Sequence, residues 1–168
     1  MIEIEISDYY NVKARVMAKR MGELNNSITK GEGNIAGFIG EFLVRDYLDG
    51  IIAHTYDFDV VANHQSYDVK TKRCTSPPKP YYDCSIAAFN TKQKCDKYIF
   101  VRILCKDDRY IKAWILGEYD KDKYFKDARF LKKGQRDGDN GFVVKADCYN
   151  IAISKLKKSV KGKGMIQN

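Results

Sequence analysis

One nearly continuous apolar run, KYIFVRILC at positions 97–105, constrains the fold of this chain more than any other segment. The run is too short to cross a membrane, and its β-branched and aromatic residues favour a strand. A strand that is apolar on both faces needs cover on both faces, as a central strand of a sheet has. The chain has 168 residues, enough for one domain that buries a sizeable core. We therefore expect a layered fold built around one sheet.

Hydrophobic periodicity predicts helices and further strands around this central strand. Apolar residues recur at helical spacing after Ser7 and after Asn34, and both residue types begin helices well. We expect helices over residues 8–24, 35–49 and 120–131, strands over 55–62, 66–73, 109–116 and 149–156, and loops over 25–34, 74–84 and 134–141. The predicted fold class is α/β, with mixed α and β elements around one sheet.

The balance of charges narrows the class of protein. Lysine and arginine together number 30 and the acidic residues 22, which gives a net charge of +8 and suits an anionic partner. No apolar run approaches the roughly 18 residues of a membrane span, and the acidic start MIEIEISD does not resemble a signal peptide. We expect a cytoplasmic protein with no membrane contact.

The cysteines favour a protein with free, reduced thiols over one held together by disulfide bonds. There are five, an odd number, and no two form a CxxC pair. Structural zinc usually takes two close ligand pairs, so we expect free thiols that pack as small apolar side chains.

Two segments of the chain differ in composition. We divide it into a single domain over residues 1–156 and a C-terminal tail over 157–168 that is rich in lysine. The tail either only raises solubility or also touches phosphates.

Two predicted strands on either side of Asn63 and His64 carry the clearest chemical signal. A two-residue hairpin turn there is plausible because asparagine tolerates a positive φ. The resulting register places Asp59 opposite Asp68, with their Cβ atoms about 5 Å apart on one face of the sheet. Two carboxylates that close repel each other unless a cation lies between them. A hard divalent ion, Mg²⁺ above all, is the usual partner of such a pair.

Lys70 lies one strand step from Asp68 on the same face. Near a metal-bound water or a phosphate oxygen, its ammonium group can orient a nucleophile and offset developing negative charge. The competing interpretation is a solvent-facing hairpin in which Asp57, opposite Lys70, forms a surface ion pair with it.

The stretch YDFDVVANHQSYDVKTK resembles the signature of the PD-(D/E)XK, or restriction-endonuclease-like, nuclease superfamily. That signature is an aspartate before an apolar strand, followed by an acid-x-lysine on the next strand. An acid on a preceding helix usually completes it, and GFIGEFLVRDYL supplies Glu41 in the right order. The motif covers residues 33–102, and the remainder is more loosely similar to small phage or bacterial nucleases of this type. The resemblance implies a restriction-endonuclease-like fold, in which a central mixed β-sheet is flanked by helices on both faces.

Carried over by residue, the resemblance makes Asp59, Asp68 and Glu41 the metal ligands and Lys70 the catalytic lysine. Glu41 would assist metal binding or orient water. No proline precedes Asp59, and the second acid is aspartate rather than glutamate, whose shorter side chain requires the metal to lie nearer the strand. Asp57 competes with Asp59 as the first ligand, and Asp59 is preferred because an apolar pair follows it directly.

Basic and aromatic residues after the second strand are candidates for holding nucleic acid. Lys72, Arg73 and Lys79 can neutralise phosphates, and the tyrosines at positions 81 and 82 can stack on bases. A basic loop with packed tyrosines explains the same pattern equally well. Gln93 lies where some members of the superfamily carry a polar active-site residue, although an ordinary surface glutamine is the favoured interpretation.

Together these observations predict a Mg²⁺-dependent deoxyribonuclease, with Mn²⁺ as a substitute metal. The expected reaction is hydrolysis of DNA phosphodiester bonds, and a homodimer is possible. The alternatives are a non-catalytic nucleic-acid-binding module with the same fold and an endonuclease of the Holliday-junction-resolvase type.

Overall fold

The computed structural model describes residues 1–22, 35–53, 55–137, 141 and 143–162. The elements in chain order are β1 (Ile2–Glu5), α1 (Asp8–Gly22), α2 (Ile35–Leu48), β2 (Ile51–Ile52), β3 (Val60–Ala62), β4 (Gln65–Cys74), β5 (Asp83–Ala87), the 3-10 helix η2 (Ala88–Lys92), β6 (Lys97–Lys106), β7 (Arg109–Asp120), α3 (Lys121–Asp127), β8 (Arg129–Leu131), β9 (Cys148–Ala152) and the 3-10 helix η3 (Ile153–Lys155).

Six strands form one mixed sheet in the order β1-β7-β6-β4-β3-β2. Only β4 and β6 run parallel, and the other neighbours are antiparallel. The run KYIFVRILC forms most of β6, which lies inside this sheet with buried residues on both faces, so the prediction of a central strand is confirmed. The mixed α/β class is confirmed with it.

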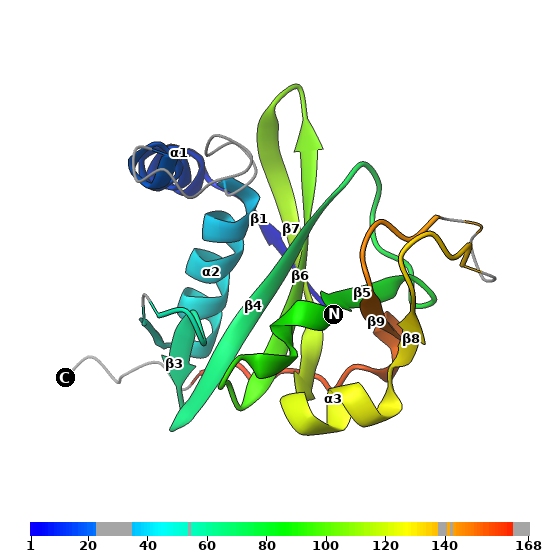
Figure 1. Ribbon diagram of the computed structural model, residues 1–168. Coiled ribbons are helices and arrows are strands. Elements are labelled where there is room, and N and C mark those ends of the chain that lie inside the picture. The colour runs from blue at the N-terminus through cyan, green and yellow to red at the C-terminus, as the bar shows by residue number, and fades with distance from the viewer. Residues whose placement is uncertain (23–34, 54, 138–140, 142, 163–168) are drawn as a thin grey trace.

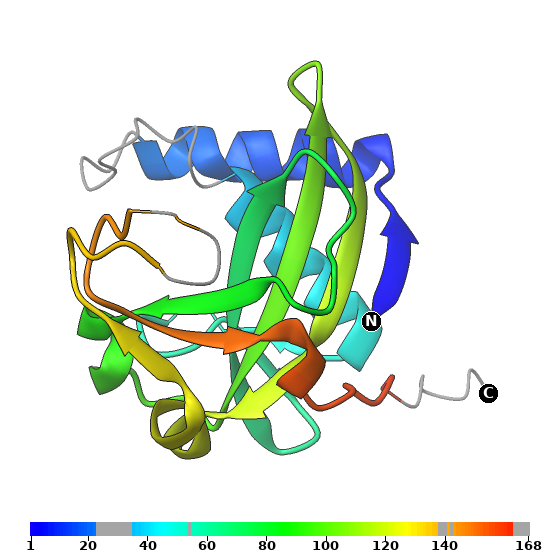
Figure 2. The same cartoon turned by 90° about the vertical axis from the view of Figure 1, so that its right-hand side faces the viewer.

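The two faces of the sheet are covered by different layers (Figure 1). Helices α1 and α2 cover one face, while the three-stranded sheet β5-β9-β8 and the short α3 cover the other. Figure 2 shows the smaller sheet lying in front of the larger one. The expectation of helices on both faces is therefore only partly right, because strands supply most of the second cover.

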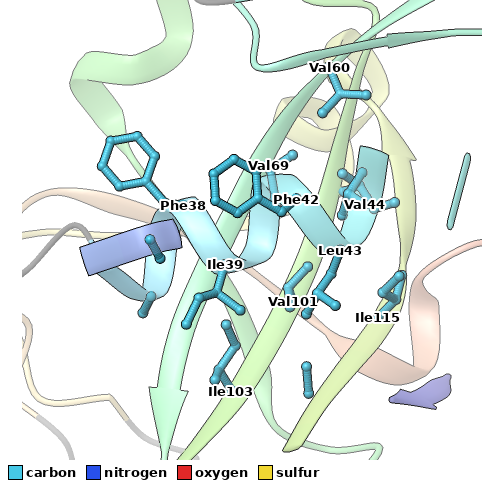
Figure 3. Packing of buried hydrophobic residues seen from close by; sticks show 14 of the residues in the cluster. Phe38, Ile39, Phe42, Leu43, Val44, Val60, Val69, Val101, Ile103 and Ile115 are labelled. Atoms are coloured by element: carbon cyan, nitrogen blue, oxygen red, sulfur yellow. The ribbon is translucent and has the colours of Figure 1, made fainter. Parts of the chain in front are cut away.

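Alternate residues of β6 belong to different hydrophobic cores. Ile99, Val101 and Ile103 pack toward α2, whereas Tyr98 and Phe100 pack toward the smaller sheet and α3. Figure 3 shows the apolar face of α2 on the first of these surfaces; its labelled helix residues are Phe38, Ile39, Phe42, Leu43 and Val44. This packing fixes α2 against the strands, and the position of α2 decides where Glu41 lies.

Several predicted element boundaries were wrong, because strand pairing between distant segments and local turns decide where these elements begin and end. The helix predicted over 120–131 stops at Asp127, and Arg129–Leu131 becomes β8 by pairing with β9. The strand predicted from residue 55 begins only at Val60, since the Thr55 side chain closes a turn with the backbone of Phe58. The last predicted strand ends at Ala152 and continues as η3.

Three strands, β1, β2 and β5, lie where no strand was predicted, and β2 has only two residues. β1 pairs with β7 at the sheet edge, and its four residues are too few for a clear periodicity. β5 begins inside the segment predicted as a loop over 74–84, directly after the prolines. The end of the first predicted helix and the loop over 25–34 lie outside the described residues.

The first part of the predicted tail lies against the domain. Lys157 pairs with Glu118 through two backbone hydrogen bonds, and the Gly162 amide donates to the Tyr47 carbonyl at 3.0 Å.

The five cysteines are free. Among the described helices, none combines the length and apolar character needed to cross a membrane.

Candidate active site

The hairpin around Asn63 and His64 forms in the predicted register. Both turn residues have positive φ, 50° and 59°, as a tight two-residue hairpin turn requires. The ladder pairs Val60 with Tyr67, and the Asp59 amide donates to the Tyr67 carbonyl at 2.9 Å. This register brings Asp59 beside Asp68, as the sequence predicted.

Asp59 and Asp68 lie in a largely buried environment. Asp68 is only 4% exposed, and Asp59 Oδ2 accepts a hydrogen bond of 2.7 Å from the Val69 amide. Burial, followed by the nearby charge of Asp68, raises the pKa of Asp59 well above its usual range, against the opposing effects of the Val69 amide and Lys70. The pair therefore has the electrostatic conflict that close carboxylates are expected to have.

Lys70 relieves part of this conflict. Its Nζ lies 2.5 Å from Asp68 Oδ2 and donates to Gln93 Oε1 at 3.3 Å. Asp68 Oδ2 nevertheless receives no hydrogen bond of normal geometry from the described residues. Asp57 takes no part, because its Oδ1 accepts from the Lys94 amide at 3.1 Å. The competing interpretation, an Asp57–Lys70 ion pair on a solvent-facing hairpin, does not match this arrangement.

The close approach of α2 to β4 brings Glu41 to the same place. A Cβ atom on Gly40 would lie 2.0 Å from the Thr71 hydroxyl, so only glycine permits the helix to lie this near the strand. Burial, and then the charges of Asp59 and Asp68, raise the pKa of Glu41 to about 8. Three carboxyl groups predicted from the motif thus influence one another through space.

An open cavity of about 580 Å³ borders this cluster. Glu41 and Lys70 both line it, so it is the space in which a substrate would meet the cluster. Lys72 and Arg73 also border it, whereas Lys79 lies on the following loop with its Nζ 5.8 Å from the centre of the Tyr81 ring. The structure therefore brings two of the three predicted nucleic-acid-binding residues to the cavity and leaves the third outside its lining.

The chemistry of the donors suits a hard divalent cation. Asp59 and Asp68 are oxygen ligands, their mutual repulsion favours a cation between them, and Glu41 adds a third carboxyl group to the set. As they stand, however, the described residues contain no group of three or more Asp, Glu, His or Cys side chains able to hold a metal. Lys70 contacts the oxygen of Asp68 that a metal would also attract. Binding Mg²⁺ would therefore change the partners of Lys70.

Two residues at or beside this cluster were undervalued in the sequence. Gln93 is 8% exposed rather than on the surface, and its side chain bridges Lys70 and the Tyr56 carbonyl. Its place in the cluster depends on the parallel pairing of β4 with β6, which sequence periodicity does not reveal. Arg102 also borders the cavity, and the signal that could have identified it is a single cation within the apolar run KYIFVRILC.

Comparison with known proteins adds no relative on which to test the resemblance. No protein-family model matches the chain, and a search of curated proteins found no match. Membership of the PD-(D/E)XK superfamily therefore stays a prediction that rests on the motif.

Proposed function

We propose that this chain is a metal-dependent nuclease with a restriction-endonuclease-like fold that hydrolyses phosphodiester bonds in DNA. The observation that carries the proposal is the convergence of three carboxyl groups and one ammonium beside an open cavity: Glu41 from α2, Asp68 and Lys70 from β4, and Asp59 from the position before β3. Clusters of strongly perturbed carboxyl groups in a cleft are typical of catalytic sites. The net charge of +8 suits a polyanionic substrate.

The residues divide the work by their chemistry. Asp59 and Asp68 would hold Mg²⁺ or Mn²⁺, and Glu41 would assist in holding the metal or orient the attacking water. The bound cation would supply Lewis-acid stabilisation of the negative charge that grows on the phosphoryl oxygens. Lys70 would point its ammonium group at the same oxygens or at the water, and Gln93 would keep that group in place.

The buried pair of Lys70 and Asp68 also favours a second function, a nucleic-acid-binding module without catalysis. In such a module, the ammonium of Lys70 would replace the metal permanently as the partner of Asp68. The nuclease is preferred because one ammonium leaves two further half-buried carboxyl groups, Glu41 and Asp59, with no salt bridge among the described residues.

Cleavage of defined DNA substrates distinguishes the two functions. Supercoiled, linear, single-stranded and branched DNA are incubated with the purified protein in EDTA, Mg²⁺ or Mn²⁺. We expect cleavage only with the metals, loss of cleavage in Asp68→Asn, and near-normal cleavage in the matched control Asp57→Asn, which removes a neighbouring carboxylate outside the cluster. Binding of DNA without cleavage under every condition would favour the binding module.

A further inference from the structure

A second cavity, of about 770 Å³, lies between the two sheets next to the candidate active site. Lys72, Asp83, Ser85 and Arg102 line both cavities, so the two spaces adjoin. The second cavity continues to residues of β5, β9 and the segment before β9; these include Tyr82, Asp137, Lys145 and Asn150. Its volume lies in the range of sites that enclose small organic ligands.

Two cations stand at the junction of the cavities. Lys72 and Arg102 are direct partners in the parallel β4–β6 ladder, two residues beyond Lys70 and Phe100. Alternation along β4 puts Lys72 on the same face as Asp68 and Lys70. The row Asp68, Lys70, Lys72 therefore leads from the candidate catalytic cluster to the second cavity.

Neither cation forms a salt bridge with an acidic side chain in the described part of the chain. Arg102 is 8% exposed, yet its guanidinium donates only to the Asp83 carbonyl at 2.8 Å and lies 5.5 Å from the centre of the Tyr82 ring. The charge of Asp83 acts on Lys72 through space, and the Asp83 carboxylate accepts hydrogen bonds from Arg129 and Asn150. Partial burial and the neighbouring charge of Arg102 lower the pKa of Lys72. A buried arginine without a carboxylate, next to a second cation, is costly unless an anion binds there.

The rest of the cavity lining is aromatic and polar, and its charged residues are of both signs. The rings of Tyr81 and Tyr82 meet edge to face, with their centres 5.1 Å apart, and both border the cavity. Asn150 borders it as well, and its Oδ1 has no hydrogen-bond donor among the described residues. An aromatic face with adjacent polar groups suits a nucleobase, and two cations suit the phosphate attached to it.

We propose that the cavity between the sheets binds one unpaired nucleotide of the substrate strand, with its phosphate against Lys72 and Arg102 and its base beside Tyr82. This inference rests on the proposed function, because it places that nucleotide next to the phosphate at Lys70. A base within a duplex is stacked and paired and cannot enter such a cavity without leaving its partner. The protein should therefore prefer single strands, overhangs or flaps to blunt duplex DNA.

Binding measured in EDTA tests the inference without requiring cleavage. Fluorescence anisotropy compares a short single-stranded oligonucleotide with a blunt duplex of the same length, and thymidine monophosphate and inorganic phosphate serve as competitors. We expect the single strand to bind at least about 10-fold more tightly than the duplex. Loss of one stacking contact is worth about 1–3 kcal/mol, so Tyr82→Leu should weaken single-strand binding about 5- to 150-fold and duplex binding far less.

Lys72→Met should weaken single-strand binding by about 10-fold while leaving the melting temperature equal or higher, because it removes the repulsion with Arg102. A lysine kept only for stability would show the opposite change in melting temperature. The matched control is Lys126→Met, which removes an exposed lysine from α3 and should affect both DNA forms slightly and equally.

Equal binding of both DNA forms, or an equal loss for both in Lys72→Met, would overturn the inference. Thymidine monophosphate binding as tightly as the oligonucleotide would also overturn it, since the ligand would then be a free nucleotide. Cleavage of a duplex with Mn²⁺, measured in parallel, reports on the proposed function separately. Selective binding without cleavage would contradict the nuclease alone, and cleavage without selective binding would contradict the cavity alone.

Discussion

At the scale of single residues, the candidate site concentrates groups that destabilise the protein in the absence of a ligand. Folding half-buries Glu41 near two other acids, and it buries Arg102 with no salt bridge to an acid among the described residues. Charges are normally kept out of such environments because the loss of hydration is costly. The sequence alone identified Glu41, Asp59, Asp68 and Lys70 through their order along the chain. It could not show the burial that gives those groups their unusual properties, because burial depends on which distant segments cover them.

Glu41→Gln tests the burial of this acid through the pH dependence of stability. The folded protein holds the Glu41 proton up to a pKa of about 8, whereas the ordinary value is 4.5. Between these values the folded state binds more protons than the unfolded state, so the free energy of unfolding falls as the pH rises. In EDTA, Glu41→Gln should therefore be about as stable as the wild type at pH 5 and more stable at pH 8.5. Urea unfolding at both pH values measures the difference.

Each pKa unit of the shift corresponds to about 1.4 kcal/mol at high pH, which sets the scale of the expected gain. Asp46→Asn, which changes an exposed acid on the same helix, is the control and should show no such increase with pH. A variant of Glu41 that is less stable than the wild type at pH 8.5 would contradict the assignment of a buried, proton-binding carboxyl group.

At the scale of elements, the contact between α2 and β4 holds the site together. Hydrophobic periodicity predicted both elements because each has a clear pattern of its own. It did not predict β5, which follows a proline-rich segment, or β8, whose three residues form a strand only beside β9. Pairing partners decide such short strands, and a single sequence contains little information about partners.

Gly40→Ala should destabilise the protein although alanine favours helices. The new Cβ would meet the Thr71 hydroxyl at 2.0 Å and the Thr71 Cβ at 3.1 Å, and overpacking of this kind typically costs about 1–3 kcal/mol. Gly37→Ala on the same helix is the matched control. A Cβ there meets nothing within 4 Å, so the variant should gain up to about 1 kcal/mol from helix propensity.

Chemical unfolding of both variants measures these opposite effects. The double variant Gly40→Ala with Thr71→Ala removes the closest clashing atom and should recover part of the lost stability. Equal gains in stability from the two glycine replacements would show that α2 does not approach β4 as closely as described here.

At the scale of the whole molecule, the smaller sheet lies to the right of the central strands in Figure 1. Residues of both sheets line the proposed nucleotide cavity. The sequence predicted one sheet with helical cover, because periodicity does not distinguish a strand of a second sheet from a strand of the first. The cavity between the sheets could not be predicted for the same reason. The apolar run KYIFVRILC did predict that both faces of the large sheet are covered.

Metal binding should stabilise the folded molecule. A ligand that binds only the folded state adds RT ln(1 + [L]/Kd), or about 2.7 kcal/mol at a concentration of 100 Kd. We expect Mn²⁺ to raise the melting temperature of the wild type and to have little effect on a variant with both Asp59→Asn and Asp68→Asn. A melting temperature that does not respond to saturating Mn²⁺ would contradict the two-carboxylate site.

The most direct test of the central claim is single-turnover cleavage of DNA by Lys70→Ala with saturating enzyme and Mg²⁺. Lys70 is assigned to charge that appears only in the transition state, so its removal should slow the chemical step by about 10²- to 10³-fold and change DNA affinity much less. The control Lys94→Ala removes an exposed lysine beside the site and should cut at nearly the wild-type rate. Cleavage by Lys70→Ala at the wild-type rate would contradict the account of this cluster as the active site of a nuclease.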